Sequence, residues 1–490
     1  MSKLLPGGLL TVLLICAGCT VGPRYKKTSA PVPPNFKEAP PPEFKEANQF
    51  KVGEPRDDTI RGKWWEIYND SQLNAFEEQV LVSNQNILQA EAQFREARAA
   101  IRITRSNLFP TVGVGASVTR ARSSGNRGVG NGFVLGTTND FQVPSVDFSW
   151  EADIWGSVRR AVEANVATAQ ASASQIENVR LSMQAELAMD YFQMHGLDQE
   201  EQLLRDTLVA YQRALQLTRD RHDQGVASGV DVAQAQTQLE TTQTALTDLG
   251  VQRAQLEHAI AVLTGKAPAE VTLPEMALNH TPPPVPIALP SELLERRPDV
   301  ASAERQMAAA NAQIGVARAA FFPTVGITAS AGLETSTLSS LINWPSRFWA
   351  IGTSLSQTVF DAGRRRAASE QARAGYDATV AAYRQSVLTA FQDVEDNLAA
   401  LRVLSQESTE EQEAVATAQR LLDLANIQYR GGITNYLEVI TAQSAALAAE
   451  RTLVQLQSRR MTASVLLVKA LGGGWNASSL PSGASLASSK

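Results

Sequence analysis

Two long stretches of the chain carry apolar or alanine side chains every three or four residues, which is the period of an α-helix. The first runs from Gly156 to about Asp223 and the second from Gly363 to Tyr429, and neither contains a proline. At about 1.5 Å per residue, each helix would extend roughly 100 Å. Helices of that length need neighbours along most of their length, so the pattern predicts coiled-coil-like packing. Many contact positions are alanine, which favours closely packed helices arranged as a tube.

Four shorter stretches alternate between apolar and polar residues, which is the period of a β-strand. They come in pairs, near residues 111–119 with 146–151 and near 325–331 with 351–359, and each pair precedes a long helix. About ten residues is the length that a tilted transmembrane strand needs. The alternative is a soluble two-layer sheet, but no helix in the sequence has an apolar face suited to covering it. Because four strands cannot close a barrel and open edges do not lie in lipid, the pattern predicts an oligomer.

The chain is a tandem duplication. Residues 109–113 (Phe-Pro-Thr-Val-Gly) return unchanged as residues 322–326, and three further pairs of segments follow at nearly the same offset. An internal repeat sets the number of structural units. We therefore expect a first repeat at 63–265, a linker at 266–290 and a second repeat at 291–473.

The remaining segments of each repeat also carry helix signals. A helix is expected from near Leu73 to about Asn107, with Asp70 or Ser71 as its N-cap. Proline suits the first turn of a helix, so Pro298 predicts a helix that runs to Ala320. Return helices are expected at 229–264 and 435–471, each after a turn that contains glycine.

Both ends of the chain lie outside the repeats. Residues 1–18 have the positive start, short apolar core and small final residues of a bacterial signal peptide, and Cys19 follows as in a lipoprotein signal. The alternative is ordinary secretion with Cys19 free. Residues 19–62 are rich in proline and predict an extended tether. Residues 474–490 are rich in serine and predict a disordered tail.

The composition excludes several classes of function. The formal net charge of -6 gives no reason to expect a nucleic-acid partner. Cys16 and Cys19 are the two cysteines, so the body of the chain has no disulfide framework. The four histidines are scattered and no two have metal-ligand spacing. We therefore expect no cofactor and no enzymatic activity.

Several motifs together resemble those of a known family. Residues 64–66 (Trp-Trp-Glu), 295–299 (Glu-Arg-Arg-Pro-Asp) and the two Phe-Pro-Thr-Val-Gly turns are similar to those of the TolC-like outer-membrane efflux proteins. Residues 18–25 resemble the mature start of the NodT-type lipoprotein branch. The resemblance implies a mainly α-helical trimer in which twelve helices form a tube, topped by a shared transmembrane β-barrel with four strands from each protomer.

The resemblance also implies a function. The chain would be the outer-membrane channel of a tripartite efflux pump, a passive conduit for drugs or other small molecules. Its partners would be a periplasmic adaptor, an inner-membrane pump of the resistance-nodulation-division (RND) type and outer-membrane lipid. It would be anchored by a lipid on Cys19 and extend into the periplasm. Two alternatives remain: the outer-membrane conduit of a type I secretion system, or a non-conducting structural coiled-coil lipoprotein.

In the family, the turns between long and return helices form the periplasmic gate. The matching candidates here are Asp231, Tyr429 and Glu438. Two other positions that are commonly charged in the family are Thr434 and Thr441 here. The resemblance therefore implies neither a second acidic ring nor a salt bridge that closes the tips.

A purely structural interpretation of the two acids is equally favoured. Ser228 with Asp231 and Asn435 with Glu438 have the spacing of a capping box, in which the acid satisfies backbone donors at a helix N-terminus. One carboxylate can serve both roles.

Arginines gather near both ends of the predicted strands. Arg159 and Arg160 begin one long helix, as residues 364–366 begin the other. We expect them to contact lipid head groups or an acidic neighbour, and the alternative is that they lie on a solvated face. Arg120, Arg122 and Arg127 border the first outer loop, where lipopolysaccharide phosphates are a candidate partner.

Overall fold

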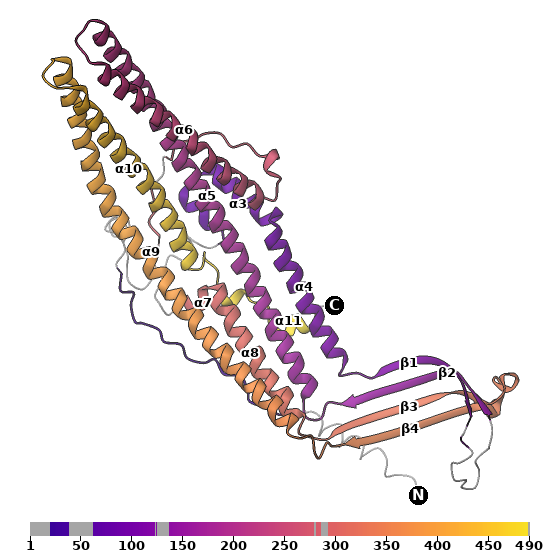
Figure 1. Cartoon of the computed structure of the whole chain (residues 1–490). Coiled ribbons are helices and arrows are strands. Elements are labelled where there is room, and N and C mark those ends of the chain that lie inside the picture. The colour runs from indigo at the N-terminus through magenta and orange to yellow at the C-terminus, as the bar shows by residue number, and fades with distance from the viewer. Residues whose placement is uncertain are drawn as a thin grey trace.

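The computed structural model describes residues 20–38, 62–122, 124, 137–278, 281–285 and 293–488. These residues form a long rod of parallel and antiparallel helices with a four-stranded sheet projecting from one end (Figure 1). Cys19, the signal segment, Arg127 and most of the first outer loop lie outside the described residues.

The two long helices are confirmed, and they have the same length. Helix α5 (Ser157–Asp223) and helix α9 (Arg364–Arg430) each contain 67 residues. Their return helices, α6 (Gly229–Leu263) and α10 (Tyr436–Ala470), each contain 35 residues. The helix lengths of the two hairpins therefore match, as the predicted tandem duplication requires.

The helices next to the sheet also repeat. Helix α4 (Gln85–Ser106) and helix α8 (Pro298–Ala319) each contain 22 residues. The shorter segments are η2 (Trp64–Tyr68), α3 (Ser71–Ser83), η3 (Pro268–Glu270), α7 (Leu293–Arg296), η5 (Leu338–Ser340), η6 (Trp344–Ser346), η7 (Ala477–Ser479) and α11 (Gly483–Ser488).

The predicted first helix is in fact two helices. Asp70 caps α3 as expected, but the helix stops at Ser83 and α4 begins at Gln85. Asn84 breaks the helix because its backbone is extended and its side chain accepts from the backbone N–H groups that start α4. Its amide also donates to the Leu263 carbonyl oxygen at the end of α6, 2.8 Å away.

Helix α5 runs through the centre of the rod. Near the sheet it packs against α4 and α8, and farther away it packs against α6 and α10. Helix α9 packs against α8 and α10 on the other side. A protomer is therefore a curved layer of helices whose edges are α4 and α6 on one side and α9 on the other (Figure 1).

The sheet consists of β1 (Thr111–Arg122), β2 (Thr137–Ala152), β3 (Thr324–Thr335) and β4 (Arg347–Ser356). The strands are antiparallel and lie in sequence order, so β1 and β4 form the two edges. All four predicted strands are present. The second begins earlier than expected, because Thr137 to Asp140 pair with the end of β1 instead of belonging to the loop.

The predicted N-terminal tether is extended but docked, at least over residues 20–38. The Val21 backbone N–H donates to the Trp155 carbonyl oxygen at 3.1 Å, directly before α5. The Tyr25 hydroxyl donates to Glu304 of α8. Farther along, one carboxylate of α9 accepts from two backbone N–H groups of the segment. The segment therefore fastens three helices together, which proline content alone did not reveal.

The prediction of a disordered C-terminal tail is wrong for residues 474–488. The tail contains the short helix α11, and Leu486 is buried against Ile101 of α4 and Ala169 of α5. The serine-rich composition concealed one apolar anchor, which is enough to dock the tail on this smaller apolar cluster.

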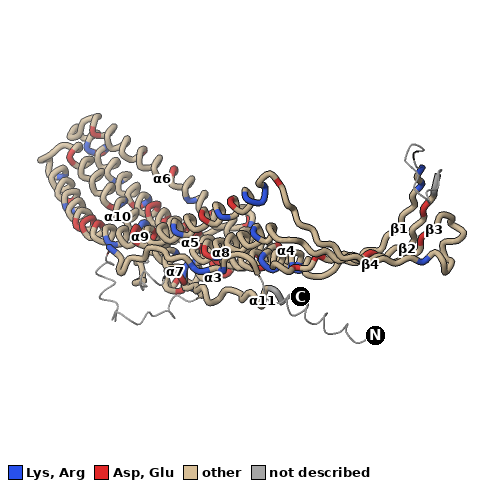
Figure 2. Tube along the Cα trace, turned by 90° about the horizontal axis from the view of Figure 1, so that it is seen from below, with Lys and Arg blue, Asp and Glu red and all other residues tan. Residues whose placement is uncertain are grey.

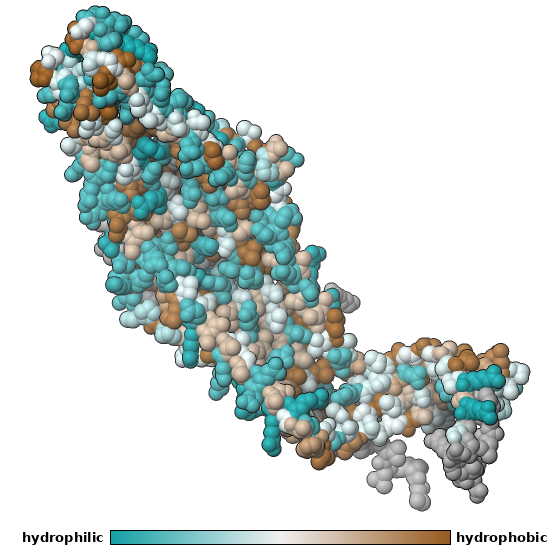
Figure 3. Space-filling view, viewed as in Figure 1, coloured by the Kyte–Doolittle hydropathy of each residue, from teal (hydrophilic) through white to brown (hydrophobic). Residues whose placement is uncertain are grey.

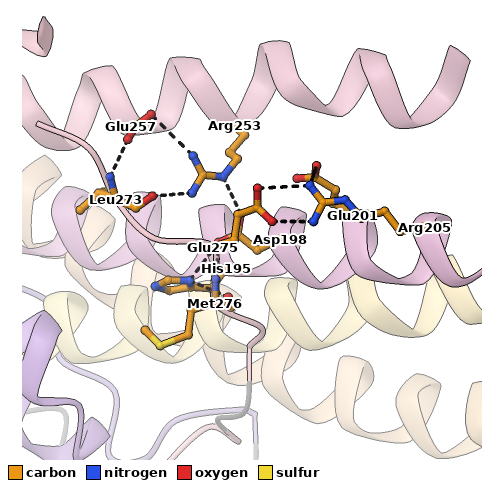
Figure 4. A network of polar contacts seen from close by, with 9 residues as sticks. All are labelled: His195, Asp198, Glu201, Arg205, Arg253, Glu257, Leu273, Glu275 and Met276. Atoms are coloured by element: carbon orange, nitrogen blue, oxygen red, sulfur yellow. Dashed lines mark hydrogen bonds and ion pairs between the residues drawn. The ribbon is translucent and has the colours of Figure 1, made fainter. Parts of the chain in front are cut away.

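A polar network fastens the linker between the repeats to the first hairpin (Figure 4). Asp198 of α5 accepts from Arg253 of α6 at 2.7 Å and from the Met276 backbone N–H at 3.0 Å. Arg253 donates to the Leu273 carbonyl oxygen at 2.9 Å, and the His195 ring lies 2.8 Å from the Met276 carbonyl oxygen. Burial favours a higher pKa for Asp198, but its hydrogen bonds with His195, Met276 and Arg253 outweigh burial and lower that pKa.

The arginines that begin the long helices have acidic neighbours in their own chain. Asp153 accepts from the backbone N–H of Arg159 at 3.0 Å and pairs with its guanidinium at 3.2 Å. Asp361 does the same for Arg365, with an ion pair of 2.6 Å. Each aspartate caps a helix and offsets the unfavourable arginine charge at its N-terminus.

Candidate functional site

The tips of the two hairpins lie beside one another at the end of the rod farthest from the sheet (Figure 1). Each long helix ends in the same turn. Gly225 and Gly432 adopt positive φ angles of 77° and 71°, which residues with a side chain rarely adopt. The next backbone N–H donates back into the helix, from Val226 to Arg221 at 2.8 Å and from Ile433 to Gln428 at 2.9 Å.

The two tips differ in how their return helices begin. At the first tip, the Ser228 hydroxyl accepts from the Asp231 backbone N–H, and the Asp231 carboxylate accepts from the Ser228 backbone N–H at 3.0 Å. That is a complete capping box. At the second tip, Asn435 accepts from the Glu438 backbone N–H at 3.4 Å. Among the described contacts, the exposed Glu438 carboxylate makes no return bond.

An arginine joins the two tips. Arg221 in the last turn of α5 donates to the carbonyl oxygens of Tyr429 at 3.0 Å and Arg430 at 3.4 Å. Its guanidinium also lies 4.6 Å from the centre of the Tyr429 ring. A cation at the C-terminal ends of two helices is favoured by both macrodipoles, and the ring adds a cation–π contact. Arg221 therefore latches the end of α5 to the end of α9.

Tyr429 lies inside the tip. Its side chain is 5% exposed, and its ring centre is 5.2 Å from that of Tyr436. Within the described part of the chain its hydroxyl has no hydrogen-bond partner. Burial raises the pKa of Tyr436 to about 12. The residues packed around the pair include Leu215, Ala235, Ala425, Val439 and Ala442.

The three residues singled out from the sequence therefore have different surroundings. Asp231 is half-buried in its capping box, Tyr429 is buried under Arg221, and Glu438 is exposed. No contact joins the two acids among the described residues. Sequence reasoning missed Arg221, although a basic residue one turn before a helix-ending glycine is a recognisable signal.

A groove of about 460 Å³ separates α6 from α10 near the tips. Val230 on one side and Leu437 on the other are exposed apolar residues along it. Val226 and Ile433 at the turns are exposed as well. Figure 3 shows brown, hydrophobic patches at the tip end of the rod. Such an apolar surface on a single chain is typical of a contact surface for another protein.

The opposite end of the rod has a sheet with two chemically distinct faces. One row across the four strands consists of Val112, Phe148, Ala329 and Ile351. Val112 is 65% exposed and Ile351 is 72% exposed, so no described residue covers this apolar face. Apolar side chains in register across all strands are typical of a sheet that faces lipid.

The neighbouring row lies on the other face of the sheet. It consists of Gly113, Asp147, Ser330 and Ala350, which are small or polar. This face suits a water-filled interior. Because β1 and β4 carry unpaired edges, the sheet can enter a membrane only after other strands cover both edges.

Two further features are absent from the described residues. Across the described residues, no helix is both long and apolar enough to cross a membrane. In the same part of the chain, no cluster of three or more His, Cys, Asp or Glu side chains could hold a metal ion.

Comparison with protein families gives a match to the model described as "Outer membrane efflux protein", over residues 77–266 and 289–473. The chain is similar to the "Probable efflux pump outer membrane protein TtgC" of Pseudomonas putida KT2440, with 30% identity over 95% of each chain. It is also similar to the "Outer membrane protein OprJ" of Pseudomonas aeruginosa PAO1, with 30% identity over 95% of each chain. The "Cation efflux system protein CusC" of Escherichia coli O6:H1 is 29% identical over 96% of this chain and 99% of that protein.

Solved structures of outer-membrane channels also match this chain. The structure titled as the outer-membrane channel OprN matches with a TM-score of 0.81 and 28% identity, over 93% of this chain and all of the other. The open state of the Neisseria gonorrhoeae MtrE outer membrane channel matches with a TM-score of 0.78 and 26% identity, over 93% of this chain and 98% of that one.

Proposed function

The chain belongs to the outer membrane efflux protein family, and on that premise we propose that three copies form a passive channel of a tripartite efflux pump. Four strands from each copy make a shared twelve-stranded β-barrel in the outer membrane, and the helices make a tube across the periplasm. A periplasmic adaptor and an RND pump in the inner membrane complete the assembly and drive small molecules outward. The channel itself catalyses no reaction.

The observation that carries this proposal is the two-faced sheet with open edges. In a ring of copies, β4 of one protomer lies antiparallel to β1 of the next, because the two strands run in opposite directions within each protomer. Closure pairs every exposed strand edge, turns the apolar rows toward lipid and encloses the polar rows. The edge helices meet in the same ring, with α9 of one copy beside α4 and α6 of the next.

We propose that the tips form the periplasmic gate. Arg221 and Tyr429 hold the two hairpins of one copy together, and opening requires this latch to separate. The Glu438 carboxylate makes no backbone hydrogen bond among the described contacts and is exposed, so it is available to line the entrance. Asp231 primarily caps α6. We assign the groove between α6 and α10 as the binding site of the adaptor.

We also propose that Cys19 carries the lipid anchor. Thr20 is the first residue that the structure describes, and it lies against Gly156 at the start of α5. Thr20 therefore lies at the junction of sheet and helices, where the periplasmic face of the membrane would lie, and this supports a lipid anchor at the N-terminal end of the described chain.

Two alternatives make different predictions. A type I secretion conduit would share the channel but serve another pump, and the names of the relatives above favour efflux. A structural lipoprotein would not need an uncovered apolar row across four strands. It would be extracted without detergent once Cys19 was removed.

The test is single-channel recording on an unlipidated Cys19→Ala protein whose oligomeric mass has been measured in detergent. We expect a trimer that inserts into bilayers and conducts. A water-soluble monomer without conductance would overturn the channel. Glu438→Ala should then change conductance or cation preference, while an unchanged channel would leave Glu438 with a structural role only.

A further inference from the structure

Three arginines lie at the far end of the apolar face of the sheet. In β1, side chains alternate between faces, so Arg120 and Arg122 continue the row of Val112. The register break opposite Gly115 and Ser117 takes its extra residue from β2, which leaves the alternation of β1 intact. In β4, Arg347 shares the face of Ile351 by the same argument.

These arginines are available to a ligand. All three are exposed, and within the described residues no carboxylate lies at ion-pair distance from any of them. Figure 2 shows basic positions toward the far end of β1, and Figure 3 shows strongly hydrophilic atoms beside apolar ones at that end of the sheet. Lipid-facing arginine is tolerated at the membrane surface, where it costs about 0–1 kcal/mol, but not at the midplane.

Aromatic side chains surround Arg347. Its guanidinium lies 3.0 Å from the centre of the Trp344 ring, and Trp349 is two residues along the same face. Trp344 is 74% exposed and Trp349 is 77% exposed. Exposed tryptophans on a lipid-facing surface mark the level of the lipid head groups.

The arginines occupy the two edge strands, which closure of the ring brings together. Residues 357–360 continue beyond β4 without a strand partner, and Val359 is largely exposed. If Val359 opposes Val112 of the next copy, the same antiparallel register places Trp349 opposite Arg122. Arg347 of one copy then lies diagonally from Arg122 of the next, about 7–8 Å away along the seam, and Arg120 lies one further pair toward the membrane.

We propose that Arg347 of one protomer and Arg120 and Arg122 of its neighbour form a binding site for the phosphate groups of lipid A, the phosphorylated glycolipid of the outer leaflet. The inference rests on the proposed trimeric channel. The channel would hold three such sites, one at each seam between protomers. Bound lipid would bridge neighbouring copies and stabilise the closed barrel.

The chemistry of the surface identifies this ligand. Guanidinium groups bind phosphate oxygens through paired, charge-assisted hydrogen bonds. The adjoining Val, Phe and Ile side chains suit acyl chains. An acidic protein would satisfy the arginines but would leave the apolar rows beside them in water, whereas an anionic lipid satisfies both.

The experiment compares purified Cys19→Ala trimers in detergent by native mass spectrometry, titrated with lipid A that carries two phosphates. The variants are Arg122→Gln, Arg347→Gln and both together. Arg347→Lys tests whether charge alone suffices. Arg213→Gln is the matched control, because Arg213 is an exposed arginine on α5, far from the sheet. Dephosphorylated lipid A is the second ligand.

Each single Gln variant should weaken binding of phosphorylated lipid A by about tenfold, which corresponds to one charge-assisted hydrogen bond. The double variant should weaken binding by a smaller factor than the product of the two single-variant factors, because both arginines contact the same ligand. The control should bind normally. Equal binding of dephosphorylated lipid, or unchanged binding by the Gln variants, would refute the site. Conductance distinguishes the two proposals. A trimer that conducts but does not bind phosphorylated lipid A would refute only the lipid site. A parent protein that neither forms a trimer nor conducts would refute the channel itself.

Discussion

The two helical hairpins of this chain have the same backbone but are fastened by different side chains. Helices α5 and α9 begin at residues 157 and 364, and α6 and α10 begin at 229 and 436, so counterparts lie 207 positions apart in both cases. In the first hairpin, Asp198 and Arg253 join the long helix to the return helix. Their counterparts are Ser405 and Arg460, so the second hairpin has a serine in place of that aspartate.

The junctions at the ends of the return helices reverse this difference. Asn84 donates to the last carbonyl oxygen of α6 at 2.8 Å, and Arg297 donates to the equivalent carbonyl oxygen of α10 at 3.2 Å. Arg297 also pairs with Asp393 of α9 at 3.0 Å. The duplication thus kept the backbone geometry while buried charge moved to different levels. The first hairpin therefore has a buried aspartate–arginine pair between its two helices, whereas the second is joined by Gln419 and Glu450 at 2.7 Å and by Arg297 at its base.

The largest effect is expected from removing the aspartate–arginine pair of the first hairpin. Asp198→Ala leaves Arg253 and the Met276 backbone N–H without their acceptor in a buried place, at a cost of about 3–5 kcal/mol. Thermal unfolding of the trimer in detergent measures this. Ser405→Ala, the counterpart in the second hairpin, and Asp206→Ala, an exposed acid on α5, should each cost under about 1 kcal/mol. Equal losses at residues 198 and 405 would contradict the asymmetry.

The same pair has a defined pH dependence. The pKa of Asp198 is lowered in the folded protein, so its contribution is complete above the unfolded value of about 3.9. It is lost only as the pH falls below about 4 through the folded pKa. The stability difference between wild type and Asp198→Ala should therefore be constant from about pH 5 to 8 and shrink below about pH 4.

The second prediction concerns a feature that the repeats share. Gly265 and Gly472 both have positive φ, and an added Cβ would lie 2.4 Å from the Ser83 carbonyl oxygen and 2.1 Å from the Arg296 carbonyl oxygen, respectively. Alanine at either position should lower the free energy of unfolding by about 2–3 kcal/mol, because it strains the local backbone and displaces the neighbouring carbonyl group. Gly225→Ala is the control, since it has positive φ but open space around it, and should cost about 1 kcal/mol. Unfolding midpoints of the three variants would rank them, and a tolerated Gly472→Ala would show that the second base is loosely packed.

The third prediction separates the two tip acids. Asp231→Ala breaks a complete capping box and should destabilise the protein by about 1 kcal/mol. Glu438→Ala removes no described backbone bond and should cost about 0.5 kcal/mol or less. Paired measurements of unfolding midpoint and channel conductance test this. If Glu438→Ala proves as destabilising as Asp231→Ala, the acid at the second tip is chiefly a cap.

Regular periodicity made much of the fold predictable. The spacing of apolar residues gave both 67-residue helices within one residue at each end, because nothing interrupts the period from Ser157 to Asp223 or from Arg364 to Arg430. The alternation of apolar and polar residues also predicted the four strands, and the repeated Phe-Pro-Thr-Val-Gly segment predicted an organisation in two units.

What the sequence did not show depends on contacts between distant segments. Asn84 breaks a helix because its amide reaches the end of α6, 179 residues away along the chain. Leu486 orders a serine-rich tail by entering a small apolar cluster. At the tips, the spacing of Ser228 and Asp231 predicted a capping box that forms, but the latch between Arg221 and Tyr429 joins residues 208 apart. No local pattern gives such a pairing.

A last substitution would make the first long helix more like the second. Burial, together with the neighbouring Glu186, raises the pKa of Asp190 to about 6, whereas its counterpart is the neutral Asn397. Below about pH 4 the carboxyl is protonated in both folded and unfolded protein, so it has no effect on stability. As the pH rises toward 6, the unfolded chain ionises first and stability falls. Asp190→Asn should therefore stabilise the protein by up to about 1 kcal/mol near pH 7.5, since partial exposure weakens the effect, and by nothing near pH 4. Unfolding midpoints at the two pH values measure this. The reciprocal Asn397→Asp should destabilise the protein near pH 7.5, and a gain from Asp190→Asn that is the same at both pH values would mean that charge is not its cause.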